Sequence, residues 1–217
     1  MHKYLKLIIN LTLIGLGASA YGQQATKNLY LGASLGYSKL SDQTATVNSQ
    51  LVNAVGGTAQ SSQNSGAAAY RVFGGVNLND YVAFELGYTQ TANETLTFSG
   101  SPTPPFLNYT GSFTAGYNGA DLGVILHPIQ LPIFKYVFVD AGVTRYTEKQ
   151  VGNASTVLGS YTQSKNQMGT GQFYGLGYDF PMSIKTVLRA SLNHYDSIGG
   201  DSALKSNLAS IAVLTQF

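Results

Sequence analysis

The stretch that decides the fold is Ala209-Ser210-Ile211-Ala212-Val213-Leu214-Thr215-Gln216-Phe217. Ala209, Ile211, Val213, Thr215 and Phe217 recur at every second position, and alternate residues of a strand point to the same face. Nothing that could serve as a cap or linker follows Phe217. We therefore expect a strand whose last residue is this aromatic.

The other end of the chain carries an export pattern. Lys3 and Lys6 precede an apolar run from Leu7 to Leu16, and Ala18-Ser19-Ala20 supplies a small-residue cleavage site. This order predicts a cleaved signal peptide over residues 1–20, followed by a short periplasmic segment over residues 21–27. The run is shorter than the ~20 residues of a spanning helix. Export together with a terminal strand that ends on an aromatic predicts an outer-membrane β-barrel.

The composition limits the function classes. Charged residues make up 10% of the chain, against ~25% in typical soluble domains. Without Lys3 and Lys6, ten basic residues balance ten acidic residues, so no basic surface for nucleic acid is expected. The absence of cysteine excludes disulfides, thiol catalysis and thiolate metal sites.

Alternation of apolar and small or polar residues recurs in eight segments, and helical periodicity does not. The segments are Asn28–Leu40, Ala68–Leu78, Val82–Thr89 and residues 119–126, 136–143, 173–180, 188–193 and 208–217. Each has about the length of a tilted transmembrane strand, and glycine gathers on the less apolar face. The pattern predicts an all-β, eight-stranded antiparallel up-and-down transmembrane β-barrel. A soluble sandwich is the alternative, but the export pattern favours apolar residues facing lipid.

The connections between these segments alternate in length. Residues 41–66, 91–116, 147–170 and 196–205 are predicted to be long extracellular loops, with 61–65 mobile at the surface, and short turns lie between them. Trp is absent, so Tyr and Phe are expected at the membrane interfaces. The predicted girdle residues are Tyr37, Tyr88, Tyr146 and Tyr195 at the loop ends, and Tyr81, Phe134, Phe180 and Phe217 at the turn ends.

Several strands resemble a known family. The segments "NLYLGASLGYSKL", "YRVFGGVNLNDYVAFELGY", "YVFVDAGVTRY", "YGLGYDF", "VLRASLNHY" and "AVLTQF" are similar, in order and spacing, to the barrel of outer-membrane protein A. The resemblance runs from Asn28 to Phe217. Many relatives carry a peptidoglycan-binding domain after the barrel. The resemblance here covers the barrel domain only, so the anchoring role is not carried over.

The resemblance also implies a polar lumen held by ion pairs. Glu85, in "FELGY", matches the family's lumenal glutamate, and Arg189, in "VLRAS", matches its arginine partner. Asp121 and Gly177 stand where a lysine and a glutamate are typical, so a second gating pair and a gated pore are not implied. By family analogy, Phe217 is the signal read by the barrel assembly machinery, although Thr215 replaces an aromatic residue.

The spacing places further charges beside this pair. Glu85, Asp121, Asp140 and Arg189 each lie about five residues from a short turn, so they form one belt inside the barrel, with Arg71 a layer above. One hypothesis is a constriction that attracts cations. The other, which we favour because small-barrel interiors are usually filled, is a buried structural network.

No catalytic, metal or cofactor site is expected. His127 precedes a proline in a turn, and His194 lies on the lipid face near the outer rim, so neither forms a triad or a metal site. The favoured hypothesis is a monomeric structural surface protein that supports the envelope and presents loops for adhesion or recognition. A small porin or slow channel is the alternative, and a lipid-modifying enzyme comes third. Outer-membrane lipid, lipopolysaccharide and surface ligands at the loops are the expected partners.

Overall fold

The computed structural model describes residues 29–64, 66–101, 103, 108–128, 131–132, 134–156 and 158–217. The predicted signal peptide and the segment 21–27 lie outside the described residues. The elements are β1 (Leu29–Leu40), α2 (Thr44–Val55), β2 (Thr58–Asn64), β3 (Ala67–Asn77), β4 (Val82–Thr91), β5 (Glu94–Ser101), β6 (Tyr109–Leu126), β7 (Val137–Thr156), β8 (Gly159–Pro181), β9 (Thr186–Asp196), the 3₁₀ turn η2 (Ile198–Gly200) and β10 (Ser206–Gln216). In the described part of the chain, no helix has the length and apolar character needed to cross a membrane.

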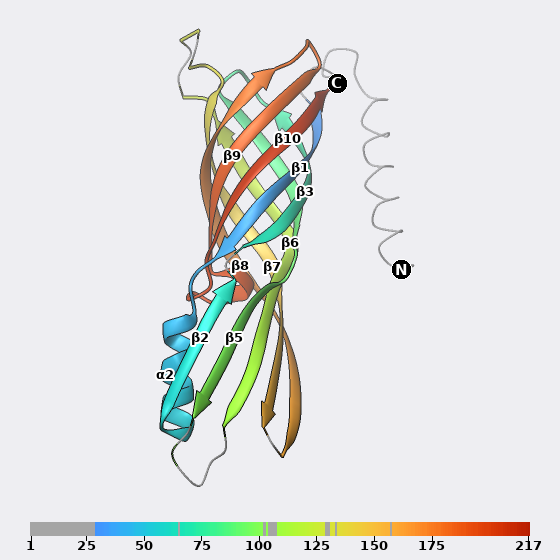
Figure 1. Ribbon diagram of the computed structural model, residues 1–217. Helices are drawn as coiled ribbons and strands as arrows, with labels where there is room; N and C mark the ends of the chain where they lie inside the picture. The colour runs from blue at the N-terminus through green and yellow to red at the C-terminus, as the bar shows by residue number, and fades with distance from the viewer. Residues whose placement is uncertain are drawn as a thin grey trace, which may run out of the picture.

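Eight of the strands close into an antiparallel barrel (Figure 1). Their order is β6-β4-β3-β1-β10-β9-β8-β7, and pairing of β6 with β7 completes the circle. The first and last strands pair over their whole length, with Tyr30 opposite Gln216 and Leu40 opposite Ser206. A closed barrel leaves no unpaired edge in lipid. The predicted fold and its closure are confirmed.

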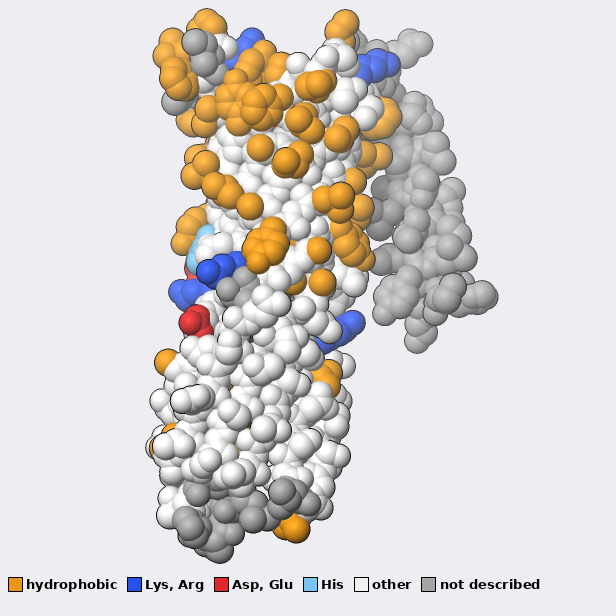
Figure 2. Space-filling model, viewed as in Figure 1, with side chains coloured by type: hydrophobic (Ala, Val, Ile, Leu, Met, Phe, Trp, Pro, Cys, Tyr) orange, Lys and Arg blue, Asp and Glu red, His pale blue; other side chains and the backbone are white. Residues whose placement is uncertain are grey.

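The two faces of each barrel strand differ as the alternation predicts. On β1, Leu31 and Leu35 are 60% and 75% exposed, whereas Tyr30 and Ser38 are 3% and 0% exposed. Figure 2 shows hydrophobic side chains spread over the barrel, charged side chains at the waist of the molecule and at the far end of the barrel, and few hydrophobic side chains beyond the waist. The outward apolar set includes Val72, Leu86, Leu122, Val143, Leu176, Leu192, Ile211 and Val213. These side chains face the lipid.

One end of the barrel carries tight turns. Asn79 Oδ1 accepts hydrogen bonds from the backbone N–H groups of Tyr81 and Val82, which closes the β3–β4 turn. Ser183 Oγ accepts hydrogen bonds from the backbone N–H groups of Lys185 and Thr186, which closes the turn between β8 and β9. The backbone N–H of Phe217 donates to the carbonyl of Leu29 (2.9 Å), so the last residue also lies at this end.

The other end carries ordered structure where long loops were predicted. β6, β7 and β8 run past the barrel, and β5 and β2 pair beside them in the order β2-β5-β6-β7-β8. We call this the extended sheet: β2, β5 and residues 109–117, 148–156 and 159–171. α2 and these strands occupy most of residues 41–66, 91–116 and 147–170, where the sequence predicted long loops. Their Ser, Thr, Gln and Asn residues lack the apolar alternation that marks a strand in a sequence.

The fourth connection, residues 196–205, folds inward over the barrel mouth. Ile198 in η2 is fully buried, and its N–H donates to the carbonyl of Leu204. Ser197 adopts a left-handed φ of 56°, followed by Gly199 and Gly200 at 65° and 82°, and this sequence of dihedral angles makes the sharp inward turn. We call residues 197–204 the lid.

Two predicted girdle residues lie inside the barrel instead. Tyr146 and Tyr195 are 0% and 2% exposed, and both pack beneath the lid. They share the strand faces of Thr144 and Asn193, which point into the lumen. The girdle assignment was wrong because it used position along the strand and neglected the period of two.

Candidate functional site

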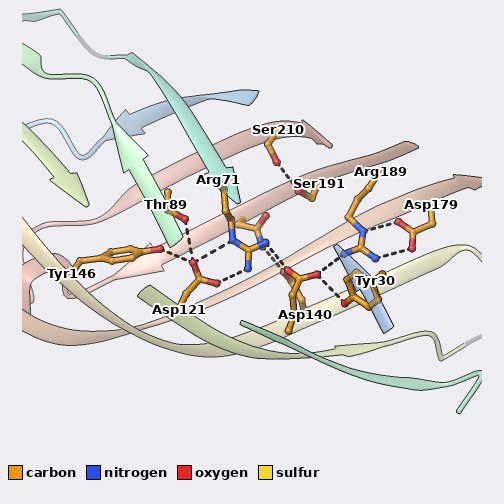
Figure 3. A network of polar contacts seen from close by, with 12 residues as sticks. Tyr30, Arg71, Thr89, Asp121, Asp140, Tyr146, Asp179, Arg189, Ser191 and Ser210 are labelled. Atoms are coloured by element: carbon orange, nitrogen blue, oxygen red, sulfur yellow. Dashed lines mark hydrogen bonds and ion pairs between the residues drawn. The ribbon is translucent and has the colours of Figure 1, made fainter. Parts of the chain in front are cut away.

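The lumen holds a continuous chain of ion pairs (Figure 3). Arg71 Nη1 and Arg189 Nη1 lie 2.5 Å and 2.9 Å from the two oxygens of Glu85, so one carboxylate joins both guanidinium groups. Arg71 also contacts Asp121 through Nη2 (2.5 Å) and Nε (3.2 Å). Glu85 pairs with Gly75, so Arg71 stands four residues further from the β3–β4 turn than Glu85, and its side chain joins the same network as Glu85 and Asp121.

The chain ends on a carboxylate that was missing from the predicted network. Arg189 binds Asp179 with two parallel hydrogen bonds, from Nε (2.7 Å) and Nη2 (2.9 Å). Such bidentate pairs have the strongest and most directional geometry. The alternation Gly175, Gly177, Asp179 places Asp179 on the lumenal face, which was the available sequence signal. The family resemblance compares only Gly177, two residues before Asp179, with a lumenal glutamate.

Asp140, the fifth predicted residue, lies beside the chain without an arginine partner. Its Oδ2 accepts from Asn193 Nδ2 (2.6 Å), and its buried Oδ1 has no hydrogen-bond partner among the described residues. A cavity of about 20 Å³ adjoins Asp140, with Glu85, Arg71 and Arg189 in its lining. Space of this size holds about one water molecule, which can solvate the second oxygen.

Neutral side chains complete the network. Tyr30 Oη donates to Glu85 Oε2 (2.9 Å), while Thr89 Oγ1 and Tyr146 Oη donate to Asp121 Oδ2 (3.1 Å and 3.3 Å). The Arg189 guanidinium also lies 4.7 Å from the centroid of the Phe138 ring. These contacts replace the hydration that Glu85, Asp121 and Arg189 lose, since they are 5%, 2% and 7% exposed.

Apolar layers close the lumen on both sides of the ion-pair chain. The layer at the lid contains Ile198 and Leu204 of the lid itself, packed against Leu40, Ala69, Tyr117, Tyr146, Phe173, Tyr195 and Leu208. Its rings stack, with centroids 5.3 Å apart for Tyr117–Tyr146 and 5.5 Å apart for Phe173–Tyr195. The layer near the turns consists of Tyr30, Phe73, Ala83, Ile125, Phe138, Ala212 and Leu214. Side chains of these two layers therefore fill the described lumen on both sides of the ion-pair chain.

The histidines form no catalytic arrangement in the described structure. His127 Nε2 lies 3.6 Å from Asp179 Oδ2 at the turn end. His194 lies at the waist, with Nδ1 2.7 Å from Asn207 Oδ1 and Nε2 3.5 Å from Asp196, whose carboxylate also pairs with Lys205 (2.9 Å). Among the described residues, no cluster of three or more His, Asp or Glu side chains could hold a metal ion.

A filled lumen inside a lipid-facing eight-stranded barrel is the architecture of small outer-membrane proteins. The sequence matches the outer membrane protein beta-barrel domain family over residues 8–217. The chain belongs to this family. As an outer-membrane β-barrel, it places its apolar belt in the outer membrane of a bacterium. A search of curated proteins finds no match.

Solved outer-membrane barrels are similar to this one over most of their length. Ail, the attachment invasion locus protein of Yersinia pestis, in complex with the heparin analogue sucrose octasulfate, is 14% identical, with a TM-score of 0.45 and coverage of 88% of this chain and 99% of Ail. The N-terminal barrel domain of OprF from Pseudomonas aeruginosa is 15% identical (TM-score 0.44; 88% and 98% covered). Neisserial surface protein A is 16% identical (TM-score 0.41; 87% and 97% covered).

Proposed function

We propose that this outer-membrane barrel is a structural surface protein whose extended sheet serves adhesion or recognition. In this proposal the extended sheet faces the exterior and the tight turns face the periplasm, which is the usual arrangement of bacterial barrels. The part of β8 that pairs with β9 covers residues 172–181, enough to cross the membrane. The thirteen residues 159–171 before it span roughly 40 Å at ~3.3 Å per residue.

The observation that carries the proposal is the contrast between the two parts of the molecule. The lumen is closed by two apolar layers and an ion-pair chain, and its cavity beside Asp140 measures about 20 Å³. The extended sheet is large, and few hydrophobic or charged side chains appear on its face in Figure 2. A filled barrel suits a scaffold, and elements held above a scaffold are where binding usually resides. This favours recognition over the alternative of a small porin or slow channel.

The remaining parts of the proposal concern partners and chemistry. A non-enzymatic role is part of the proposal. The partners are outer-membrane lipid and lipopolysaccharide around the barrel, the assembly machinery at Phe217, and surface ligands at the extended sheet. We also propose that the protein acts as a monomer. We propose that it binds no nucleic acid, because ten basic and ten acidic residues remain when Lys3 and Lys6 are left out.

A shortened β7–β8 hairpin tests the recognition role. Lys149 and Asn166 face each other in register, so replacement of residues 150–165 by an Asn-Gly turn removes the tip of the hairpin and leaves the barrel strands unchanged. Bacteria that display the full chain should adhere to surfaces or cells more strongly than bacteria that display equal amounts of the shortened variant. Equal adhesion across a panel of surfaces would contradict the proposal.

A further inference from the structure

The extended sheet has one face that continues the inner wall of the barrel. Because directly paired residues share a face, the register defines rows that cross the strands. One row is Phe98, Gly111, Ala154 and Tyr161; the next is Leu96, Phe113, Gly152 and Gln163; the third is Glu94, Ala115, Gln150 and Lys165. Together these rows form a concave surface, which we call the cradle.

Glycines let two aromatic rings of the cradle lie flat against the sheet. The Phe98 ring occupies the position where a Cβ atom of Gly111 would stand. The Phe113 ring covers Gly152, and three of its carbons would lie 3.3–3.7 Å from an added Cβ atom there. Phe113 is 41% exposed, so it offers an accessible apolar surface.

Tyr161 forms the opposite side of the cradle. It stands on β8, three strands away from Phe98 on β5, a distance of roughly 14 Å at ~4.8 Å per strand. Only Gly111 and Ala154 lie between them in their row, so the floor of the cradle is low. Tyr161 is 65% exposed. The cradle holds a cavity of about 320 Å³, within the range of small-molecule sites.

The polar side chains that line the cavity are mainly neutral amides, whereas Glu94, in the third row of the cradle, is buried. Gln150, Gln163 and Lys165 line the cavity, and Lys165 is the single formal charge among its lining residues. Gln150 Nε2 donates to Glu148 Oε1 (2.5 Å), which orients the amide and leaves its carbonyl oxygen available. An amide side chain offers both donor and acceptor atoms. Hydroxyl groups, which also donate and accept, are the matching ligand groups.

We propose that the cradle binds a neutral pyranose oligosaccharide. The C–H groups of a sugar face carry partial positive charge and pack against the negative face of Phe113, Phe98 or Tyr161. The hydroxyl groups at the rim of the pyranose ring then hydrogen-bond to Gln150 and Gln163. This inference rests on the proposed function, because it names the ligand class of the outward-facing sheet.

The geometry favours a sugar over a peptide strand. Peptides that extend a sheet pair with the backbone of an edge strand, and the edges of the extended sheet are β2 on one side and residues 159–171 of β8 on the other. The cradle instead uses side chains from the face of β5, β6, β7 and β8. A near-neutral lining also gives little attraction for a sulfated or phosphorylated chain, since Lys165 is its single cation.

An oligosaccharide array tests this inference on the full chain in lipid nanodiscs. The array carries neutral oligosaccharides, sulfated oligosaccharides and the polysaccharide released from the producing bacterium's own lipopolysaccharide. We expect binding to at least one neutral oligosaccharide or to neutral regions of that polysaccharide. Comparison of these two kinds of probe distinguishes a foreign glycan from the bacterium's own lipopolysaccharide. Binding confined to sulfated probes, or no binding, would overturn the inference.

Variants place the binding in the cradle. Phe113→Ala and Tyr161→Ala should each weaken binding to the captured glycan at least tenfold, and Phe113→Tyr should retain it. Thr110→Ala, an exposed change on the opposite face of β6, is the matched control and should bind like the wild type. Unchanged affinity in both alanine variants would refute the cradle site. The glycan inference fails if no oligosaccharide on the array binds, or if the edge of β8 binds a peptide instead. If the shortened hairpin still reduces adhesion in that case, the proposed function stands.

Discussion

Arg189 Nη1 lies 2.9 Å from Glu85 Oε2, although 104 residues separate the two in the chain. Their strands, β9 and β4, are not neighbours in the barrel, so the bond crosses the lumen. Glu85 holds Arg71 on its other oxygen, and Arg189 holds Asp179. The pair therefore links opposite walls of the barrel through one buried polar chain.

Loss of Arg189 should destabilise the barrel strongly. Arg189→Ala leaves Glu85 and Asp179 as buried carboxylates with one fewer cation, which costs about 3–5 kcal/mol of unfolding free energy. Urea unfolding followed by the gel shift between boiled and unboiled samples measures this loss. Adding Glu85→Ala to Arg189→Ala should recover part of it. Strictly additive losses would show that the two side chains do not interact.

Asp140 should behave in the opposite way to Asp179. Because Asp140 Oδ1 has no hydrogen-bond partner in the described structure and no arginine contacts it, Asp140→Asn should leave stability unchanged or raise it by about 1 kcal/mol. Asp179→Asn, which disrupts a bidentate pair, should lower the urea midpoint. A larger drop in the urea midpoint for Asp140→Asn than for Asp179→Asn would contradict the assignment of Asp179, and not Asp140, as the partner of Arg189.

Glu148 should make the lid sensitive to pH. Glu148 lies beyond the barrel beneath Gly199 of the lid, and desolvation raises its pKa above the ordinary value of 4.5. The closed lid therefore favours the protonated form, so its stability is greatest below pH 4.5 and falls as the pH rises through the raised pKa. The protection factors of residues 197–204, corrected for the intrinsic pH dependence of amide exchange, should fall over this window. Glu148→Gln should abolish this fall, and an unchanged pH profile of the protection factors in that variant would exclude Glu148 as its source.

Removal of Phe217 should impair assembly. Its ring is exposed at the turn end, and its N–H pairs with Leu29 as the last link between β10 and β1. Deletion should lower the amount of folded protein in the outer membrane, measured by surface labelling of cells with equal synthesis. Phe217→Tyr is the control that keeps an aromatic terminus. Equal surface levels after deletion would remove the assembly role.

The alternation of apolar and small residues was sufficient to predict the barrel, its closure and its lipid face. Leu31 and Leu35 alternate with Tyr30 and Ser34 because one face meets lipid and the other a packed lumen. The extended sheet could not be predicted in this way. Both faces of a segment such as β2 meet polar surroundings, so its order comes from pairing with β5 and contacts with α2. The Glu85–Arg189 contact followed from family resemblance. Alternation could place Asp179 in the lumen, but its bond to Arg189 depends on the register between β8 and β9.

Single-channel recording in a planar lipid bilayer tests the central claim most directly. The claim is that the lid, the stacked rings around Tyr117 and Tyr146, and the ion-pair chain keep the lumen closed. The wild-type protein should give no steady conductance, and a double variant with Tyr117→Ala and Tyr146→Ala should give measurable openings. Sustained conductance by the folded wild-type barrel, unchanged in the double variant, would contradict the account and favour a porin.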